Sequence, residues 1–231
     1  MIDCIVLAGG LGTRLKETVP DKPKPLAPIQ GTPFLDLLLN QLPFASKIVL
    51  AVGYKASQII DYYTNSPLPL DFSIETTPLG TGGAIKHALQ KTTTNDLLVL
   101  NGDSFLNLSF EPFIKAHQNA NADLTIASVH VENASRYGRL TLDSQTNKIV
   151  GFQEKSLNVE PGWINAGIYL MKRDLFENLD LGPTFSLEKE VFPHLLNKNV
   201  LSYPCSGTFI DIGTKESYLQ AQQLLTAKVS I

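Results

Sequence analysis

The sequence predicts an α/β fold, in which helices cover both faces of a mostly parallel, mixed central sheet that carries a small antiparallel addition. Up to about residue 130, short apolar runs alternate with helical patterns, which is typical of parallel strands joined by helices. Beyond residue 130 the strand-like runs follow one another with only turn residues between them. A chain of 231 residues is long enough for one such domain and short for two.

The first expected strand leads directly into a glycine-rich loop. Residues 4–8 are apolar, which favours a strand buried on both faces of the sheet. The segment Gly9-Gly10-Leu11-Gly12-Thr13-Arg14 follows, and its glycines allow the backbone to turn sharply and approach a ligand closely. Such a loop directs successive N–H groups at one spot, and Arg14, Lys16 and Lys24 add positive charge, so we expect a polyphosphate site.

Two other phosphate-binding loops do not fit this segment. A P-loop ends in Gly-Lys-Ser or Gly-Lys-Thr, whereas Gly12 is followed by Thr13 and Arg14. The dinucleotide fingerprint requires a third glycine at position 15, where this chain has Leu15. On spacing alone, a purely structural turn from strand to loop remains the alternative.

The rest of the first part alternates helices and strands. The expected helices cover residues 33–42, 56–63, 84–89 and 110–119, and the expected strands cover residues 47–52, 70–76, 96–100 and 123–130. The glycines at positions 80, 82 and 83 precede a helix, where they either cap it or offer backbone groups to the edge of a base. Asp103 follows the strand at 96–100, at the crevice where open parallel sheets bind ligands, although a plain turn is the alternative.

The second part is expected to contain strands at residues 137–142, 149–153 and 163–171. A helix is predicted from Ser186, whose hydroxyl suits the cap position, and a last helix is predicted at 215–227. The four histidines show no metal-ligand spacing. Because its strands follow one another closely, we expect this part to form an added mixed or antiparallel section along one side of a cleft.

Composition excludes several classes of protein. The chain is 43% apolar and 18% charged, and its net charge is −3, so neither disorder nor a nucleic-acid surface is indicated. Two cysteines cannot build a disulfide framework. Apolar runs of membrane length and a leader pattern are both missing, so the expectation is a cytoplasmic protein without a membrane partner. The oligomeric state is open, and a homo-oligomer is allowed.

The segments Gly9 to Leu15 and Lys24 to Pro28 together resemble the signature of the sugar-1-phosphate nucleotidyltransferases, Gly-Gly-x-Gly-Thr-Arg-Leu followed by Lys-Pro-Leu-x-Pro. The resemblance implies a three-layer, Rossmann-like nucleotidyltransferase fold over residues 1–231. It assigns nucleotide binding to about residues 1–130 and sugar-phosphate binding to about 131–231. A nucleoside triphosphate and a sugar 1-phosphate are the implied partners, and Mg²⁺ is the implied cofactor.

The resemblance also assigns the nucleotide and metal sites. Arg14 would bind the β- and γ-phosphates, and Lys24 would neutralise the α-phosphate. Asp103 and Asp211 would hold Mg²⁺. The complete implied set of nucleotide-binding residues is Leu7, Ala8, Gly9, Gly10, Gly12, Thr13, Arg14, Lys24, Pro78, Gly80, Thr81, Asn101 and Gly102.

Three motifs of the second part carry the implied acceptor site. Tyr137-Gly138, Phe152-Gln153-Glu154-Lys155 and Asn165-Ala166-Gly167 resemble family motifs at the sugar phosphate. The implied sugar-phosphate-binding residues are Gly138, Glu154, Lys155, Asn165 and Gly167, and Lys155 joins Arg14, Lys24 and Asp103 as the catalytic set. The family has Pro after this lysine, whereas Ser156 stands here, so the geometry of this loop is open.

Within the family, the likeness favours guanylyl transfer from GTP to D-glycero-α-D-manno-heptose 1-phosphate, which yields GDP-heptose for surface polysaccharide. Uridylyl transfer to N-acetylmuramic acid 1-phosphate and guanylyl transfer to mannose 1-phosphate are the alternatives. A non-catalytic sugar-nucleotide-binding subunit is disfavoured because Arg14, Lys24, Asp103, Lys155 and Asp211 are all present. A dinucleotide-dependent oxidoreductase is disfavoured because no acidic residue directly follows the second strand.

Overall fold

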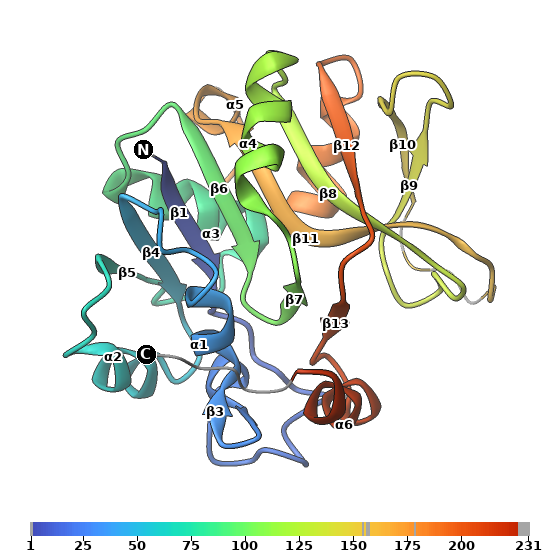
Figure 1. The fold of residues 1–231 in the computed structure, drawn as a ribbon. Coiled ribbons are helices and arrows are strands. Elements are labelled where there is room, and N and C mark those ends of the chain that lie inside the picture. Colours follow the sequence, from blue (N-terminus) through green and yellow to red (C-terminus); the bar gives the residue numbers. More distant parts are fainter. Residues whose placement is uncertain (1, 154, 156–157, 178, 226–231) are drawn as a thin grey trace.

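The protein is built on one large mixed sheet (Figure 1), seen in a computed structural model that describes residues 2–153, 155, 158–177 and 179–225. The central strands are β1 (Asp3–Leu7), β4 (Lys47–Val52), β5 (Leu70–Ile74) and β6 (Asp96–Asn101), and neighbouring strands in this group are parallel. β11 (Gly162–Lys172) runs antiparallel to β6, β8 (Leu124–Val131) and β9 (Arg139–Leu142). β12 (Val200–Cys205) lies parallel to β8, and β10 (Ile149–Gln153) forms a hairpin with β9.

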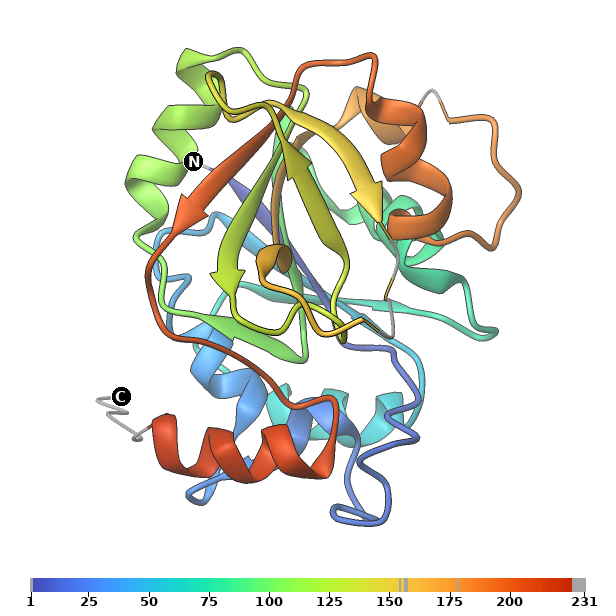
Figure 2. The same cartoon turned by 90° about the vertical axis from the view of Figure 1, so that its right-hand side faces the viewer.

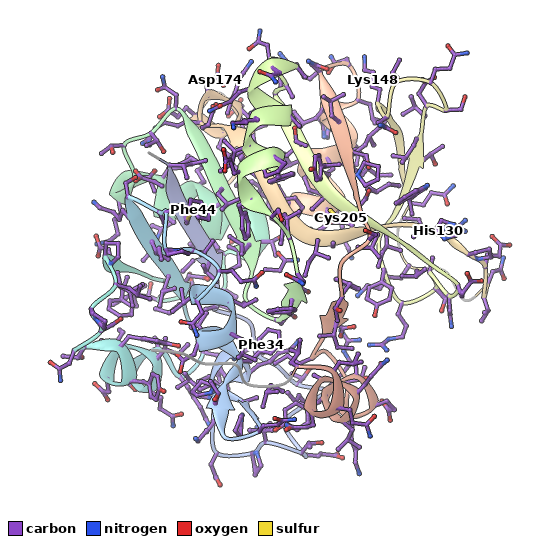
Figure 3. All side chains as sticks on the ribbon, viewed as in Figure 1. Phe34, Phe44, His130, Lys148, Asp174 and Cys205 are labelled. Atoms are coloured by element: carbon purple, nitrogen blue, oxygen red, sulfur yellow. The ribbon has the colours of Figure 1, made fainter. Side chains whose placement is uncertain are left out.

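Two hydrophobic cores flank the sheet, which confirms the expected three layers. On β1, Cys4 and Val6 face one core and Ile5 faces the other, as the two-residue period of a strand requires. The first core is covered by α1 (Phe34–Leu39), α2 (Ala56–Tyr63) and α4 (Phe110–Asn119), and the fully buried Phe34 is labelled in Figure 3. The second is covered by α3 (Gly80–Ala88), α5 (Asp174–Glu177) and the helical turns at Leu187–Val191 and Phe192–Leu195.

Several boundaries agree with the sequence prediction, and others do not. Residues 47–52, 56–63, 110–119 and 149–153 form the expected elements. The helix predicted at 33–42 is shorter at both ends: residues 32–33 pair as β3 with β2 (Pro28–Ile29), and the helix ends at Leu39. The helix predicted at 84–89 begins earlier, at Gly80. The last helix, α6 (Lys215–Leu224), ends before 227, and residues 226–227 lie outside the described residues.

Short strands at the lower edge of the sheet assemble the region where ligands would bind. The parallel strands end there, beside residues 8–33 and α6 (Figures 1 and 2). β7 (Ser104–Leu106) pairs with β13 (Phe209–Asp211), so that Asp211 lies opposite Ser104. The Ile212 N–H donates to the Asp103 carbonyl oxygen at 2.9 Å. A tertiary pairing of three residues on each strand thus brings together two aspartates that lie far apart in the sequence.

Within the described part of the chain, no helix is long and apolar enough to cross a membrane.

Candidate active site

A pocket of about 580 Å³ lies at the carboxyl ends of β1, β4 and β5, and we call it the glycine-loop pocket. It is formed at the point where several strand ends leave an open crevice. Seven of the predicted nucleotide-binding residues line it, namely Leu7, Gly9, Gly10, Pro78, Gly80, Thr81 and Asn101. Tyr54 and Glu75 also line it, and sequence analysis did not single them out as ligand contacts.

Other predicted nucleotide-binding residues support this pocket. Ala8 is buried, and its N–H donates to the Ala51 carbonyl at 2.8 Å. The Gly102 N–H donates to the Leu7 carbonyl at 2.9 Å, and a Cβ on Gly102 would lie 2.5 Å from that oxygen. Gly12 has a φ of +58°, which favours glycine, and it lies against Lys24. Thr13 is exposed.

A second pocket, of about 320 Å³, holds most of the predicted charged residues, and we call it the charged pocket. Its predicted lining residues are Arg14, Lys24, Asn101, Asp103, Gly138, Lys155, Asn165 and Asp211. Asn101, Asp103 and Glu188 line both this pocket and the glycine-loop pocket, so the two are adjoining parts of one cleft.

An ion pair lies at the centre of the charged pocket. Lys24 Nζ lies 2.6 Å from Asp103 Oδ2. Burial acts to raise the pKa of the Asp103 carboxyl, but the charge and hydrogen bond of Lys24 outweigh it, so this pKa lies below its ordinary value. Asp103 is therefore a carboxylate at neutral pH.

Asp211 is held firmly in place. It is buried, and its Oδ1 accepts hydrogen bonds from the Gly213 N–H at 2.6 Å and from Ser217 Oγ at 3.2 Å. Tyr137 Oη donates to Oδ2 at 2.7 Å, and Arg136 Nη2 lies 3.3 Å from both oxygens. Burial and the bond to Asp211 both raise the pKa of Tyr137, so the phenol stays protonated and donates.

The acceptor side of the cleft is also ordered by hydrogen bonds. Asn165 Nδ2 donates to Tyr169 Oη at 2.9 Å, and Asn165 Oδ1 accepts from the Gly167 N–H at 2.9 Å. An amide has two N–H groups and an oxygen with two lone pairs, so Asn165 keeps one donor and one acceptor site for a ligand. Gly167 is buried with a φ of +78°, and a Cβ there would lie 2.8 Å from Asn101 Nδ2. Glu154, another predicted residue, lies outside the described residues.

The glycines of α3 pack against another segment, which explains why the helix begins at Gly80 and not near Ala84. The Gly82 and Gly83 N–H groups donate to the Phe185 carbonyl at 3.0 and 3.2 Å. A Cβ on Gly80 would lie 2.5 Å from that same oxygen. The weak helix propensity of glycine predicts that α3 starts later, but the close contact of these glycines with Phe185 outweighs that propensity.

Glu188 joins the two parts of the cleft. Its Oε2 accepts from Thr81 Oγ1 at 2.8 Å and from Ser186 Oγ at 3.1 Å. The Thr81 hydroxyl in turn accepts from the Leu187 N–H at 2.8 Å. Thr81 therefore anchors the segment that closes the glycine-loop pocket.

The residues present suit a magnesium ion that is completed by substrate. Mg²⁺ prefers oxygen ligands and is usually held by one or two carboxylates together with substrate phosphates. Asp103 and Asp211 both line the charged pocket, so their carboxylates could share such an ion. Among the described residues, no group of three or more His, Cys, Asp or Glu side chains could hold a metal ion alone.

Signals for the additional pocket residues were weak in the sequence. Glu75 directly follows β5, and its strand-end position was a usable signal. Arg136 and Tyr137 stand beside the predicted Gly138, but their partner Asp211 is remote in the chain. In the sequence, Glu188 resembles an ordinary acidic residue in the first turn of a helix, which does not mark it as a pocket residue.

The fold and this cleft are those of a nucleotidyltransferase. The sequence model of the nucleotidyl transferase family matches residues 3–228, and the chain belongs to this family.

Its relatives include guanylyltransferases. It is 36% identical to D-glycero-α-D-manno-heptose 1-phosphate guanylyltransferase from Aneurinibacillus thermoaerophilus, over 97% of this chain and 98% of the relative. It is 34% identical to mannose-1-phosphate guanyltransferase from Yarrowia lipolytica, over 98% of this chain but 64% of that longer protein. The crystal structure of HddC from Yersinia pseudotuberculosis complexed with GMP-PN is similar, with a TM-score of 0.85, 36% identity, and coverage of 96% of this chain and 99% of HddC.

Proposed function

We propose that this protein transfers a guanylyl group from GTP to a sugar 1-phosphate, with D-glycero-α-D-manno-heptose 1-phosphate as the favoured acceptor. The observation that carries the proposal is the convergence of Arg14, Lys24, Asp103, Lys155 and Asp211 in one pocket that adjoins the glycine-loop pocket. The 36% identity to a heptose 1-phosphate guanylyltransferase, which extends over nearly the full length of both chains, supports the choice of substrates.

In the proposed reaction, a phosphate oxygen of the sugar 1-phosphate attacks the α-phosphorus of GTP, and pyrophosphate leaves. A phosphate monoester is already an anionic nucleophile, so the chain need not supply one. Catalysis then consists of positioning two anions and neutralising their charge. Arg14 binds the β- and γ-phosphates, Lys24 neutralises the α-phosphate, and Lys155 holds the attacking phosphate.

Asp103 and Asp211 would hold Mg²⁺, which when bound neutralises charge on the triphosphate and the leaving pyrophosphate. Lys24 has a second task in this arrangement. It pairs with Asp103 at 2.6 Å, and its ammonium group would leave this partner to neutralise the α-phosphate.

Glu75 is our candidate for selecting the base. Its Oε2 accepts the Leu79 N–H at 2.9 Å, which fixes the carboxylate in the wall of the glycine-loop pocket. Guanine presents N1–H and N2–H donors along one edge, and a carboxylate accepts from both. Adenine has an acceptor in place of N1–H, so a carboxylate disfavours it.

The proposed division of the cleft follows the chain. Residues from about 1–130 supply the glycine-loop pocket apart from Glu188, and residues from 131–231 supply Gly138, Lys155, Asn165 and Asp211 to the charged pocket. We therefore assign the first part to the nucleotide and the second part mainly to the sugar phosphate.

Guanylyl transfer to mannose 1-phosphate is the second candidate, and the likeness to the Yarrowia lipolytica guanyltransferase supports it. The test is pyrophosphate release with Mg²⁺, in which GTP, UTP, dTTP, CTP and ATP are each paired with heptose, mannose, glucose and N-acetylmuramic acid 1-phosphates. We expect turnover with GTP and the heptose. Turnover with UTP alone would overturn the base assignment, and nucleotide binding without any turnover would overturn the proposed reaction.

A further inference from the structure

The cleft continues past the charged pocket into a third cavity of about 320 Å³, which we call the distal pocket. Gly138, Asn165, Glu188 and Lys189 line both the charged pocket and the distal pocket. The wall that belongs to the distal pocket alone includes Leu140 and Phe152, from the β9–β10 hairpin.

Shared residues give the three pockets an order. The glycine-loop pocket and the charged pocket have Asn101, Asp103 and Glu188 in common, whereas among the described residues the glycine-loop and distal pockets share only Glu188. The charged pocket is therefore in the middle. If the base occupies the first pocket and the phosphates occupy the second, the sugar extends from its 1-phosphate toward the third.

The floor of the distal pocket is apolar and well supported. The Phe152 ring stacks on Phe192, with centroids 5.0 Å apart and planes inclined by 24°. Phe192 in turn packs against Tyr169, at 5.5 Å, and the Tyr169 hydroxyl holds Asn165. The ring that faces the cavity is thus coupled to the residue that we place at the sugar.

The rim of the distal pocket is polar. Lys189 is exposed, and the Glu188 carboxylate is fixed by Thr81 and Ser186 through one oxygen, Oε2. An apolar floor with a few polar groups at the edge suits a hydroxylated carbon chain, whose C–H groups contact the ring while its hydroxyls reach the rim.

We propose that the distal pocket receives the C6–C7 chain of a heptose and thereby selects a heptose 1-phosphate over the matching hexose 1-phosphate. This inference rests on the proposed guanylyl transfer and adds a specificity-determining residue, Phe152. A heptose of manno configuration exceeds mannose by one CH(OH) unit, whose two heavy atoms occupy about the volume of two waters, roughly 60 Å³. The cavity of about 320 Å³ has room for this unit.

The test compares two acceptors in the same variants. With GTP and Mg²⁺, kcat/KM is measured for heptose 1-phosphate and for mannose 1-phosphate in the wild-type protein, Phe152→Trp and Phe152→Leu. Phe152→Trp narrows the cavity, so we expect kcat/KM for the heptose to fall about tenfold or more, and by clearly more than the value for mannose. Phe152→Leu removes the ring face and should lower the heptose value a few-fold, again by more than the mannose value.

Phe44→Leu is the matched control, because Phe44 is 38% exposed and packs on Phe110 outside this cleft. Thermal unfolding of each variant checks that the fold is retained. A loss that is equal for both acceptors, no loss in either variant, or a wild-type preference for mannose would each overturn the selection by the distal pocket and leave guanylyl transfer standing. No turnover with any acceptor would overturn the proposed function itself and this inference with it.

Discussion

The sharpest prediction concerns Glu75 and the choice of base. Glu75 Oε2 is occupied by the Leu79 N–H at 2.9 Å, and Oε1 lies 2.5 Å from the position that a Cβ on Gly9 would take. The carboxylate is therefore fixed beside the glycine loop. Glu75→Gln keeps the size of this side chain but replaces one acceptor by an N–H₂ donor, which would meet a donor on the guanine edge.

The expected magnitude follows from the number of hydrogen bonds affected. A good two-point contact to a base edge is worth about 1–3 kcal/mol of discrimination, which corresponds to roughly 5–150-fold. We expect kcat/KM for GTP to fall by about 10–100-fold in Glu75→Gln, with ATP unchanged or improved. The assay is pyrophosphate release with each nucleotide at a fixed concentration of sugar 1-phosphate, and the KM for the sugar phosphate should not change.

Glu111→Gln provides the matched control for this measurement. Glu111 lies on α4, is exposed, and pairs with Lys115 at 2.6 Å outside the glycine-loop pocket. This variant should retain the wild-type ratio of GTP to ATP. If Glu75→Gln also retains that ratio, the carboxylate does not contact the base, and the selection must come from backbone groups of the loop.

Three further predictions concern Asp103, Lys155 and Asp3. Asp103→Asn should lower the rate of a single turnover by about 10²–10³-fold with the thermal midpoint nearly unchanged, whereas a near-normal rate would remove Asp103 from the metal site. Lys155→Met should raise the KM for the sugar phosphate by about tenfold and leave the KM for GTP unaltered, since only one charge-assisted contact is lost. Burial acts to raise the pKa of the Asp3 carboxyl, but the hydrogen bonds that it accepts from Thr93 and Ser46 outweigh this effect. The pKa of Asp3 therefore lies below its ordinary value of 3.8. The stability that Asp3 contributes should therefore be fully present above about pH 4 and be lost as the pH drops through the folded-state pKa. Asp3→Asn should be about 1–3 kcal/mol less stable at pH 7 in urea unfolding, with a gap that narrows at pH 3, and an equal gap at both pH values would contradict this.

The parallel part of the fold could be predicted because its signals are local. The runs at 47–52 and 96–100 are apolar on both faces, and helix patterns such as 56–63 and 110–119 lie between such runs. Burial on both faces of a strand and on one face of a helix produces a characteristic hydrophobic pattern in the sequence. The same holds for the glycine loop, where the backbone approach to a ligand requires particular residues.

The strands β7, β12 and β13 could not be predicted from the hydrophobic pattern because their pairing is tertiary. β7 and β13 contain three residues each and are stable only because they pair with each other. β12, with the sequence Val-Leu-Ser-Tyr-Pro-Cys, includes a proline. Because proline has no N–H to donate to a neighbouring strand, its presence indicates an edge strand or a loop. In the structure β12 does lie at an edge, where it pairs with β8.

The placement of Asp211 beside Asp103 has the same origin. Composition says nothing about which aspartates meet, and the resemblance alone implied the pair. In physical terms the meeting depends on the β7–β13 ladder and on the Ile212 N–H bond to the Asp103 carbonyl. A substitution that breaks this ladder would separate the carboxylates without touching either one.

The cleft itself depends on a segment from the opposite half of the chain. Phe185 accepts two N–H bonds from α3, and Glu188 bonds Thr81 while it lines all three pockets. In the proposed arrangement, a nucleotide bound against α3 would contact the same segment that borders the sugar. Glu188 Oε2 is already held by two hydroxyls in the absence of substrate. This favours a cleft that is assembled before the substrates arrive, in which the two binding parts act as one unit.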